Sequence, residues 1–367
     1  MFRFGDELGP LRIVHVYEPS VALKGVLVVD NVASGPAVGG LRVAPDVSVG
    51  ECFRLARAMT FKNAAAGLPH GGGKSVLFAD PRGSRAALEQ QVRAFACALR
   101  DARDYIFGPD MGTDETCMAW VKDEIGRAVG LPRELGGIPL DEIGATGWGL
   151  THATEVALEY CDFELEGARV AVQGFGAVGR HAARFLVERG AVLVAASDSR
   201  GAVHDPGGLE VSVLIALKAA GKSVAELSGG QRLDRDAIID VPCDIWIPAA
   251  RPDVINEGNA ARLRTRLLME GANVPVTPEA ERYLHERGVL CVPDFIANAG
   301  GVICAAMEYR GASERQALQT IEEKLRRNTR RVLEAARDEG VAPRQAALRL
   351  ALERVKAAMR TRRWSLF

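Results

Sequence analysis

The stretch Val170–Asp198 reads VAVQGFGAVGRHAARFLVERGAVLVAASD and decides the fold class. A short apolar strand runs into Gly174-Phe175-Gly176-Ala177-Val178-Gly179, a helical pattern follows, and a second apolar strand ends at Asp198. Strand–helix–strand alternation predicts a parallel sheet with helices on its faces. The glycines let a pyrophosphate approach the N-terminus of the helix, where backbone N–H groups are free to bind it. The stretch therefore predicts a Rossmann-type dinucleotide-binding domain.

The end of the second strand bears on the choice of cofactor. Asp198 is placed to accept the ribose hydroxyls, with Ser199 beside it, and a carboxylate there would repel a 2′-phosphate. We therefore expect NAD rather than NADP. Arg200 follows two residues later and could accommodate the phosphate instead. The alternative for the whole motif is a glycine-bearing turn in an α/β domain that binds nothing.

In the N-terminal half, two lysines flank a run of small residues in Phe61–Ser75. Lys74 follows the triplet Gly71-Gly72-Gly73 and leads into the apolar run Val76–Phe78. Glycines of this kind occur where the backbone takes positive φ or comes very close to another group. Burial lowers the pKa of an ammonium group, by roughly 3–5 units when complete, so Lys74 could act as a base near neutral pH. The alternative is a glycine turn with a surface lysine. A phosphate loop is excluded, because its pattern requires glycine where Leu68 stands.

A third polar candidate lies in the turn-rich segment 106–114. Asp110, taken alone, is an ordinary turn residue. Taken with Lys62 and Lys74, it completes a set of groups that hydride chemistry requires: a cation for a substrate carboxylate, a desolvated base and a proton carrier. The N-terminal half is therefore expected to supply the acid–base groups.

Composition excludes several other functions. The 367 residues carry 46 basic and 47 acidic side chains, a net charge of −1, which gives no electrostatic basis for binding nucleic acid or anionic membranes. No apolar run approaches the roughly 20 residues that a membrane span needs. The seven cysteines are scattered and never in C-x-x-C spacing, which favours reduced thiols, a cytoplasmic protein and no metal site.

Eight short motifs together carry a family resemblance over roughly residues 35–305. They are Gly39-Gly40-Leu41-Arg42, Thr60-Phe61-Lys62-Asn63, Gly71–Lys74, Asp110-x-Gly112, Ala145-Thr146-Gly147, Gly174–Gly179, Glu270-Gly271-Ala272-Asn273 and Asn298-Ala299-Gly300-Gly301-Val302. In this order they resemble the glutamate/leucine/phenylalanine/valine family of amino-acid dehydrogenases. The resemblance implies oxidative deamination of an L-amino acid to a 2-oxo acid and ammonia, with hydride transfer to NAD(P)+, in a homo-oligomer.

The resemblance also implies roles for individual residues. Lys62 would bind the substrate α-carboxylate, Lys74 would activate water and Asp110 would relay protons at the substrate nitrogen. The other implied contacts are Asn298, Gly39 and Gly40 to substrate, and Thr146, Asn273, Ala249, Ser199 and the glycine motif to cofactor. The segment after Ala249-Ala250 departs from the glutamate enzymes, which usually have Glu-Asn there.

Substrate choice can be approached through two further departures. Glutamate enzymes have a lysine where this chain has Val38 and a serine where it has Ala305, and both bind the side-chain carboxylate. Because a buried unpaired charge is costly, we expect an apolar substrate of the Leu, Val, Phe or Trp type, as in the leucine and phenylalanine dehydrogenases. The expected pocket lining is Val38, Gly108, Val302 and Ala305. The alternatives are a glutamate dehydrogenase that uses Lys24, Arg42 or His70 instead, and a catalytically silent dinucleotide-binding protein.

The expected architecture is α/β with two domains and helices at the end. Residues 1–140 are expected to form an α/β substrate-binding and catalytic domain, and residues 141–310 the Rossmann-type domain, with a cleft between them. Residues 311–367 are expected to form helices that pack back toward the first domain.

Overall fold

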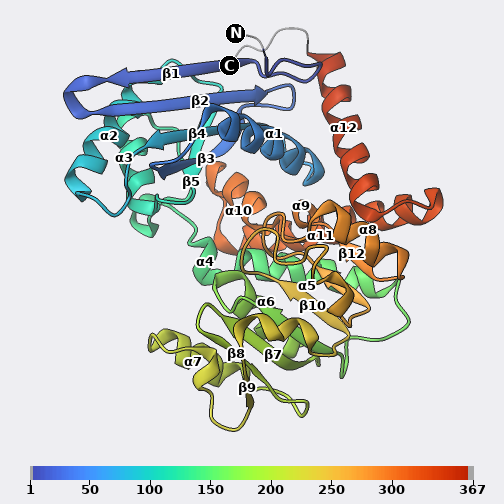
Figure 1. The fold of residues 1–367 in the computed structure, drawn as a ribbon. Coiled ribbons are helices and arrows are strands. Elements are labelled where there is room, and N and C mark those ends of the chain that lie inside the picture. The colour runs from blue at the N-terminus through green and yellow to red at the C-terminus, as the bar shows by residue number, and fades with distance from the viewer. Residues whose placement is uncertain (1–2, 363–367) are drawn as a thin grey trace. The chain divides into compact units, whose positions relative to one another are not determined.

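The structure is a computed structural model that describes residues 3–362 (Figure 1). Its chain divides into two compact units. Among the described residues, the first comprises 3–139, 302–317 and 348–362, and the second comprises 140–301 and 318–347. In the described part of the chain, no helix is both long and apolar enough to cross a bilayer. The predicted combination of an N-terminal α/β domain, a Rossmann-type domain and C-terminal helices is confirmed.

The first unit is built on a mixed sheet. Its strands are β1 (Arg12–Glu18), β2 (Leu23–Asn31), β3 (Ala37–Ala44), β4 (Gly71–Phe78) and β5 (Tyr105–Pro109), and its helices include α1 (Val49–Ala65), α2 (Arg85–Ala98) and α3 (Glu115–Ile125). The strand order is β1-β2-β4-β3-β5, with β3 parallel to both β4 and β5. Apolar residues of β2 and β4 pack against α1 on one face, and a second core beneath α2 and α3 covers the other.

The glycine triplet belongs to strand β4. It is needed for close packing rather than for a turn. A Cβ at Gly71 would lie 1.7 Å from the Asn31 carbonyl oxygen, and one at Gly72 would lie 2.0 Å from the Thr60 nitrogen. No side chain fits at these distances, so the glycines allow β4 to lie directly against α1 and β2. This places Lys74 inside the sheet.

The second unit contains the strand–helix alternation. Its elements up to Val292 are α4 (Leu140–Ile143), α5 (Ala145–Leu158), β6 (Arg169–Gln173), α6 (Ala177–Val187), β7 (Val192–Asp198), β8 (Gly201–His204), α7 (Val211–Ala219), β9 (Gln231–Leu233), β10 (Ile245–Pro248), β11 (Leu267–Met269), α8 (Pro278–Glu286) and β12 (Leu290–Val292). The strand order is β12-β11-β10-β6-β7-β8-β9. Strands β12 through β7 are parallel, whereas β8 and β9 extend the edge antiparallel.

Helix α5 contains two of the glycines of segment 136–149. Gly147 and Gly149 lie inside this helix. A Cβ at Gly147 would lie 2.7 Å from the Ala182 nitrogen, so this glycine lets α5 pack closely on α6. Within segment 136–149, Gly136 and Gly144 take positive φ, and Gly144 directly precedes α5.

The chain ends in helices. These are α9 (Asp294–Ala297), α10 (Gly300–Tyr309), α11 (Glu314–Glu339) and α12 (Pro343–Thr361). A capping box formed by Ser313 and Gln316 stands at the start of α11. The Gln316 side-chain oxygen accepts the Ser313 N–H at 2.8 Å, and the Ser313 hydroxyl oxygen accepts the Gln316 N–H at 3.3 Å.

Candidate active site

Lys74 and Asp110 meet in the first unit. Lys74 lies in the central strand β4, and Asp110 directly follows the carboxyl end of β5. The Lys74 Nζ lies 2.8 Å from Asp110 Oδ2. Arg42 of β3 donates from Nε to the same oxygen at 2.8 Å and from Nη1 to Glu51 at 2.6 Å. Asp110 Oδ1 has no partner within residues 3–362, so it is available to a ligand.

Burial decides the electrostatics of this pair. The Lys74 side chain is only 7% exposed, and desolvation lowers its pKa although Asp110 acts to raise it. Burial alone would raise the pKa of Asp110, but Lys74 and Arg42 outweigh it, so the net shift is downward. The arrangement thus holds an ionised carboxylate beside a lysine that gives up its proton more readily than a free lysine does.

Two glycines of β3 leave room for this pair. A Cβ at Gly40 would lie 2.7 Å from the Asp110 Cβ and 3.1 Å from the Lys74 Nζ. A Cβ at Gly39 would lie 1.8 Å from the Gly73 carbonyl oxygen, inside the strand pairing. The predicted site residues Gly39 and Gly40 therefore adjoin the Lys74–Asp110 pair.

Lys62 lies in the last turn of α1 and is partly buried. Its neighbour Asn63 anchors that turn by donating to the Gly71 carbonyl oxygen at 2.7 Å. The same helix packs on Gly72 through Thr60. Lys62 is thus carried on the helix that covers the strand of Lys74.

The predicted pocket residues gather around one small apolar cluster in the first unit. Val38 packs with Ile106 and Val129, and Ala305 lies against this cluster from α10. Gly108 adjoins it as well, because a Cβ there would lie 3.5 Å from the Val129 Cγ2. Val302 is half-buried and lies three residues before Ala305, a spacing that shares one face of a helix.

The glycine motif of the second unit fits a dinucleotide. Gly174 takes positive φ and packs on Ala249, and a Cβ at Gly179 would lie 2.0 Å from the Gly174 carbonyl oxygen. A Cβ at Gly176, by contrast, would meet no atom within 4 Å. Gly176 is the N-cap of α6 and supplies no side-chain cap, so the N–H groups of the first turn remain available. Phe175 is buried beneath the turn, and Ala177 and Val178 begin the helix.

The Asp198 carboxylate accepts more hydrogen bonds from the protein than is expected of a group that binds ribose hydroxyls. Its Oδ1 accepts the Arg200 N–H at 2.9 Å and the Ser223 hydroxyl at 2.8 Å. Its Oδ2 accepts the Lys218 ammonium at 2.8 Å and the Val224 N–H at 3.1 Å. Burial opposes these donors, yet together they lower the pKa of Asp198 to about 2. A carboxylate offers about four lone-pair sites, and here the protein occupies all of them.

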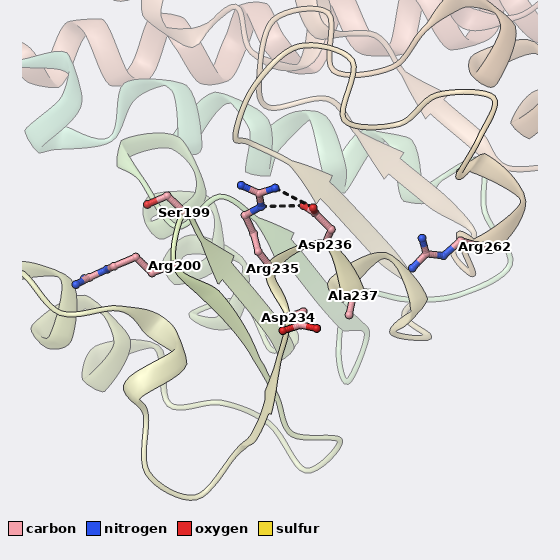
Figure 2. Close-up of a pocket in the computed structure, with 7 residues that line it drawn as sticks. All are labelled: Ser199, Arg200, Asp234, Arg235, Asp236, Ala237 and Arg262. Atoms are coloured by element: carbon pink, nitrogen blue, oxygen red, sulfur yellow. Dashed lines mark hydrogen bonds and ion pairs between the residues drawn. The ribbon is translucent and has the colours of Figure 1, made fainter.

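A pocket of about 440 Å³ adjoins the end of β7 (Figure 2). It is lined by Ser199, Arg200, Asp234, Arg235, Asp236, Ala237 and Arg262. The Arg235 guanidinium donates from Nε and Nη2 to the two Asp236 oxygens, each at 2.8 Å, as the dashed lines in Figure 2 show. Its Nη1 has no partner in the described part of the chain. Three arginines and two aspartates line the pocket, and one of the arginines, Arg262, is paired with Asp240 at 2.7 Å.

The structure brings the predicted residues Asn273 and Asn298 together. Asn298 Nδ2 donates to Asn273 Oδ1 at 3.1 Å and to the Ala272 carbonyl oxygen at 3.0 Å. Thr146 belongs to the same group, because a Cβ at Gly301 would lie 3.2 Å from its Oγ1. These residues follow the carboxyl ends of β11 and β12 or begin α5. That edge of a parallel sheet is where ligands bind in open α/β folds.

Sequence reasoning missed a buried cluster of charged residues that connects the segments following β11 and β12. Arg344, in the first turn of α12, lies 2.7 Å from Glu270, 2.5 Å from Glu281 and 3.0 Å from Asp294. Asp294 in turn accepts the Val274 N–H at 2.9 Å. The motif containing Glu270 is visible in the sequence, but nothing in the sequence links it to Arg344. Arg42 is likewise part of a recognisable motif, although its pairing with Asp110 is seen only in the structure.

Known proteins resemble this chain over nearly its whole length. Residues 136–363 match the family model described as Glutamate/Leucine/Phenylalanine/Valine dehydrogenase, and residues 14–127 match the dimerisation domain of the same family. A glutamate dehydrogenase of Aeropyrum pernix is 39% identical over 91% of this chain and 85% of its own. An NADP(+)-dependent glutamate dehydrogenase of Pyrobaculum calidifontis is 39% identical over 97% and 92%. The hetero-hexameric glutamate dehydrogenase of Thermus thermophilus, solved in a Leu-bound form, superimposes with a TM-score of 0.85 at 31% identity, covering 98% of this chain and 91% of that one.

These relatives contradict the expectation of an apolar substrate. Both curated relatives are named glutamate dehydrogenase. The expectation treated the absence of a lysine at Val38 and a serine at Ala305 as the loss of all carboxylate recognition. Absence of two partners does not exclude a third, and the structure retains buried polar groups near both positions. By the family model that covers residues 136–363 and by relatives 39% identical over nearly its full length, the chain belongs to the Glu/Leu/Phe/Val family of amino-acid dehydrogenases.

Proposed function

We propose that this protein catalyses the reversible oxidative deamination of L-glutamate to 2-oxoglutarate and ammonia. The observation that carries the proposal is the buried Lys74–Asp110 pair, with Nζ and Oδ2 2.8 Å apart beside Gly40. A base and a proton carrier are what this reaction requires in addition to a hydride acceptor. The names of the relatives favour glutamate as the substrate.

The proposed steps divide the chemistry among these residues. Gly174–Gly179 would hold a nicotinamide dinucleotide, which would supply the hydride acceptor for the substrate Cα. Asp110 takes the proton that the amino group loses as the imine forms. Neutral Lys74 removes a proton from the water that attacks this imine, which gives a carbinolamine. Asp110 returns a proton to the nitrogen, and the carbinolamine hydroxyl gives its proton to solvent as the C=O bond forms and ammonia leaves. Lys62 binds the α-carboxylate, and Asn298, Asn273 and Thr146 position substrate and nicotinamide.

We further propose that both NAD and NADP are accepted. The expectation of NAD alone requires Asp198 to repel a 2′-phosphate. In the structure its charge is paired with Lys218 and its oxygens already accept four hydrogen bonds. The neighbouring pocket presents Ser199 and the unpaired Nη1 of Arg235, which suit a phosphate monoester. One relative is named NADP(+)-dependent.

An oligomer is part of the same proposal. The family model that matches residues 14–127 is described as a dimerisation domain, and the Thermus thermophilus relative is described as a hetero-hexamer. Sedimentation of the purified protein would test this directly, and a monomer at micromolar concentration would contradict it.

The decisive experiment measures NAD(P)H formation from L-Glu, L-Leu, L-Val and L-Phe, with each cofactor in turn. Glutamate should be the preferred substrate. Lys74→Ala should reduce turnover by at least about 10³-fold, since the general base and the charge beside Asp110 are both lost. Lys24→Ala is the matched control, because Lys24 is exposed on β2 of the same sheet. Turnover of the apolar substrates alone, or near-normal activity in Lys74→Ala, would refute the proposal.

A further inference from the structure

If glutamate is the substrate, its side-chain carboxylate must find a partner. The cluster around Val38 and Ala305 is apolar, and burying a carboxylate there without a hydrogen bond or a cation would be prohibitive. The sequence offered three alternative partners for this carboxylate: Lys24, Arg42 and His70. Arg42 is already paired with Asp110 and Glu51. Lys24 is exposed on β2. His70 remains.

His70 is buried with half of its hydrogen-bonding capacity unused. Its side chain belongs to a residue only 4% exposed, and its Nε2 has no partner within residues 3–362. Its Nδ1 lies 3.2 Å from the Pro36 carbonyl oxygen. The Gly71 N–H also donates to that oxygen, at 3.1 Å, which holds the two segments together. The contact with Pro36 therefore fixes the orientation of the ring, and Nε2 makes no hydrogen bond to the described residues.

The contacts of His70 are with two segments that also supply residues of the apolar cluster. Pro36, which it contacts, lies two residues before Val38. Its ring meets Tyr309 edge-on, with centroids 6.1 Å apart, and Tyr309 lies four residues after Ala305 on α10. Residues four apart share one face of a helix. His70 is thus bracketed by neighbours of the two positions at which the expected lysine and serine are missing.

We propose that His70 is the specificity-determining residue that binds the substrate's side-chain carboxylate through Nε2, taking up a proton as it does so. This inference rests on the proposed function. The carbonyl oxygen of Pro36 can only accept, so Nδ1 carries a hydrogen and the neutral ring presents Nε2 as a bare acceptor. A carboxylate is an acceptor too. The two can pair only when a proton from solvent makes the ring an imidazolium.

The surroundings of His70 disfavour its protonated form when no carboxylate is bound. Burial lowers the pKa of His70, the contact with Pro36 acts to raise it, and Arg310, directly after α10, lowers it further. Tyr309, the last residue of α10, is the titratable group in contact with the ring. A bound carboxylate reverses the balance, since an adjacent negative charge favours the imidazolium. Binding of a dicarboxylate is therefore coupled to protonation, whereas binding of a monocarboxylate is not.

The first test needs no variant. Glutarate, the dicarboxylate that lacks the amino group, is titrated into the cofactor-loaded protein at pH 8 in two buffers of different ionisation enthalpy, with butyrate as the monocarboxylate comparison. Glutarate should bind with uptake of close to one proton, and butyrate with none. Uptake by neither ligand, or equally by both, would overturn the proposal. This result does not depend on turnover, so it separates failure of the His70 assignment from failure of the proposed reaction.

The second test uses His70→Asn, with His15→Asn as the matched control on the exposed face of β1. The KM for L-glutamate should rise about 10- to 100-fold in His70→Asn, the range expected for one charge-assisted hydrogen bond. The kcat and the KM for L-norvaline, which has no side-chain carboxylate, should change less than about threefold. His15→Asn should match the wild type. Equal losses for both substrates would mean a merely structural role and would overturn the assignment.

Discussion

Replacing Glu270 by glutamine should change how the stability of the protein depends on pH. Glu270 is fully buried, its Oε1 has no partner among the described residues, and it shares Arg344 with Glu281 and Asp294. Burial raises the pKa of Glu270 from 4.5 to about 8, more than Arg344 can offset. A raised pKa means that the folded state holds its proton more tightly than the unfolded state does.

The size of the effect follows from this shift. A pKa change from 4.5 to about 8 is 3.5 units, which at about 1.36 kcal/mol per unit corresponds to roughly 5 kcal/mol. This stability is fully present below pH 4.5 and is lost as pH rises through about 8. Glutamine carries no charge at any pH, so the Glu270→Gln variant does not lose this stability as the pH rises. Relief of repulsion on Glu281, whose pKa burial also raises, makes 5 kcal/mol an upper bound.

The assay is urea unfolding of both proteins between pH 5 and pH 9, at one fixed protein concentration. The difference in unfolding free energy, variant minus wild type, should grow by at least about 2 kcal/mol between pH 5 and pH 8 and then level off. Glu323→Gln is the control, because Glu323 is exposed on α11 and its curve should run parallel to that of the wild type. Parallel curves for Glu270→Gln itself would refute the argument that a buried, protonated carboxyl group lies in this cluster.

Two further substitutions test the proposed sites. Gly40→Ala should lower kcat about 10²-fold without unfolding the protein, because the new Cβ would lie 2.7 Å from the Asp110 Cβ and displace this acid from Lys74. Steady-state kinetics and circular dichroism would check this, and full activity would contradict it. Arg235→Ala should weaken binding of 2′,5′-ADP about tenfold and leave that of 5′-ADP unchanged, as measured by calorimetry. The control is Arg232→Ala on β9, which does not line the pocket, and unchanged binding of both nucleotides to Arg235→Ala would move the phosphate contact elsewhere.

The local sequence pattern predicted the Rossmann-type unit well, for a physical reason. Strand, glycine turn, helix and strand follow one another within Val170–Asp198, so every interaction that defines the unit is close in sequence. The capping box of α11 is equally local, because Ser313 and Gln316 are three residues apart. The first unit was harder to predict, because its glycine triplet suits either a turn or a tightly packed strand. The choice is made by Thr60 and Asn31, which contact it across the sheet.

Long-range polar partners lay beyond sequence reasoning altogether. Asp198 illustrates this: its position after a strand predicts a ribose acceptor, but Lys218, Ser223 and Val224 reach it from later segments and occupy its oxygens. Arg344 reaches Glu270 across 74 residues. A side chain's chemistry depends on what remains unpaired after folding, and that cannot be read from its residue type or its place in a motif.

The contradicted expectation about the substrate has the same origin. It inferred specificity from two side chains that the chain lacks, Val38 and Ala305 standing where a lysine and a serine were expected. Recognition of a carboxylate requires a donor or a cation at a position in space, not at a position in a motif. In the proposal above, His70 meets that requirement once protonated, because Pro36 fixes its ring and Nε2 has no partner among the described residues. Exchanging a permanently charged lysine for a histidine that must first be protonated would keep the substrate and make its binding depend on pH.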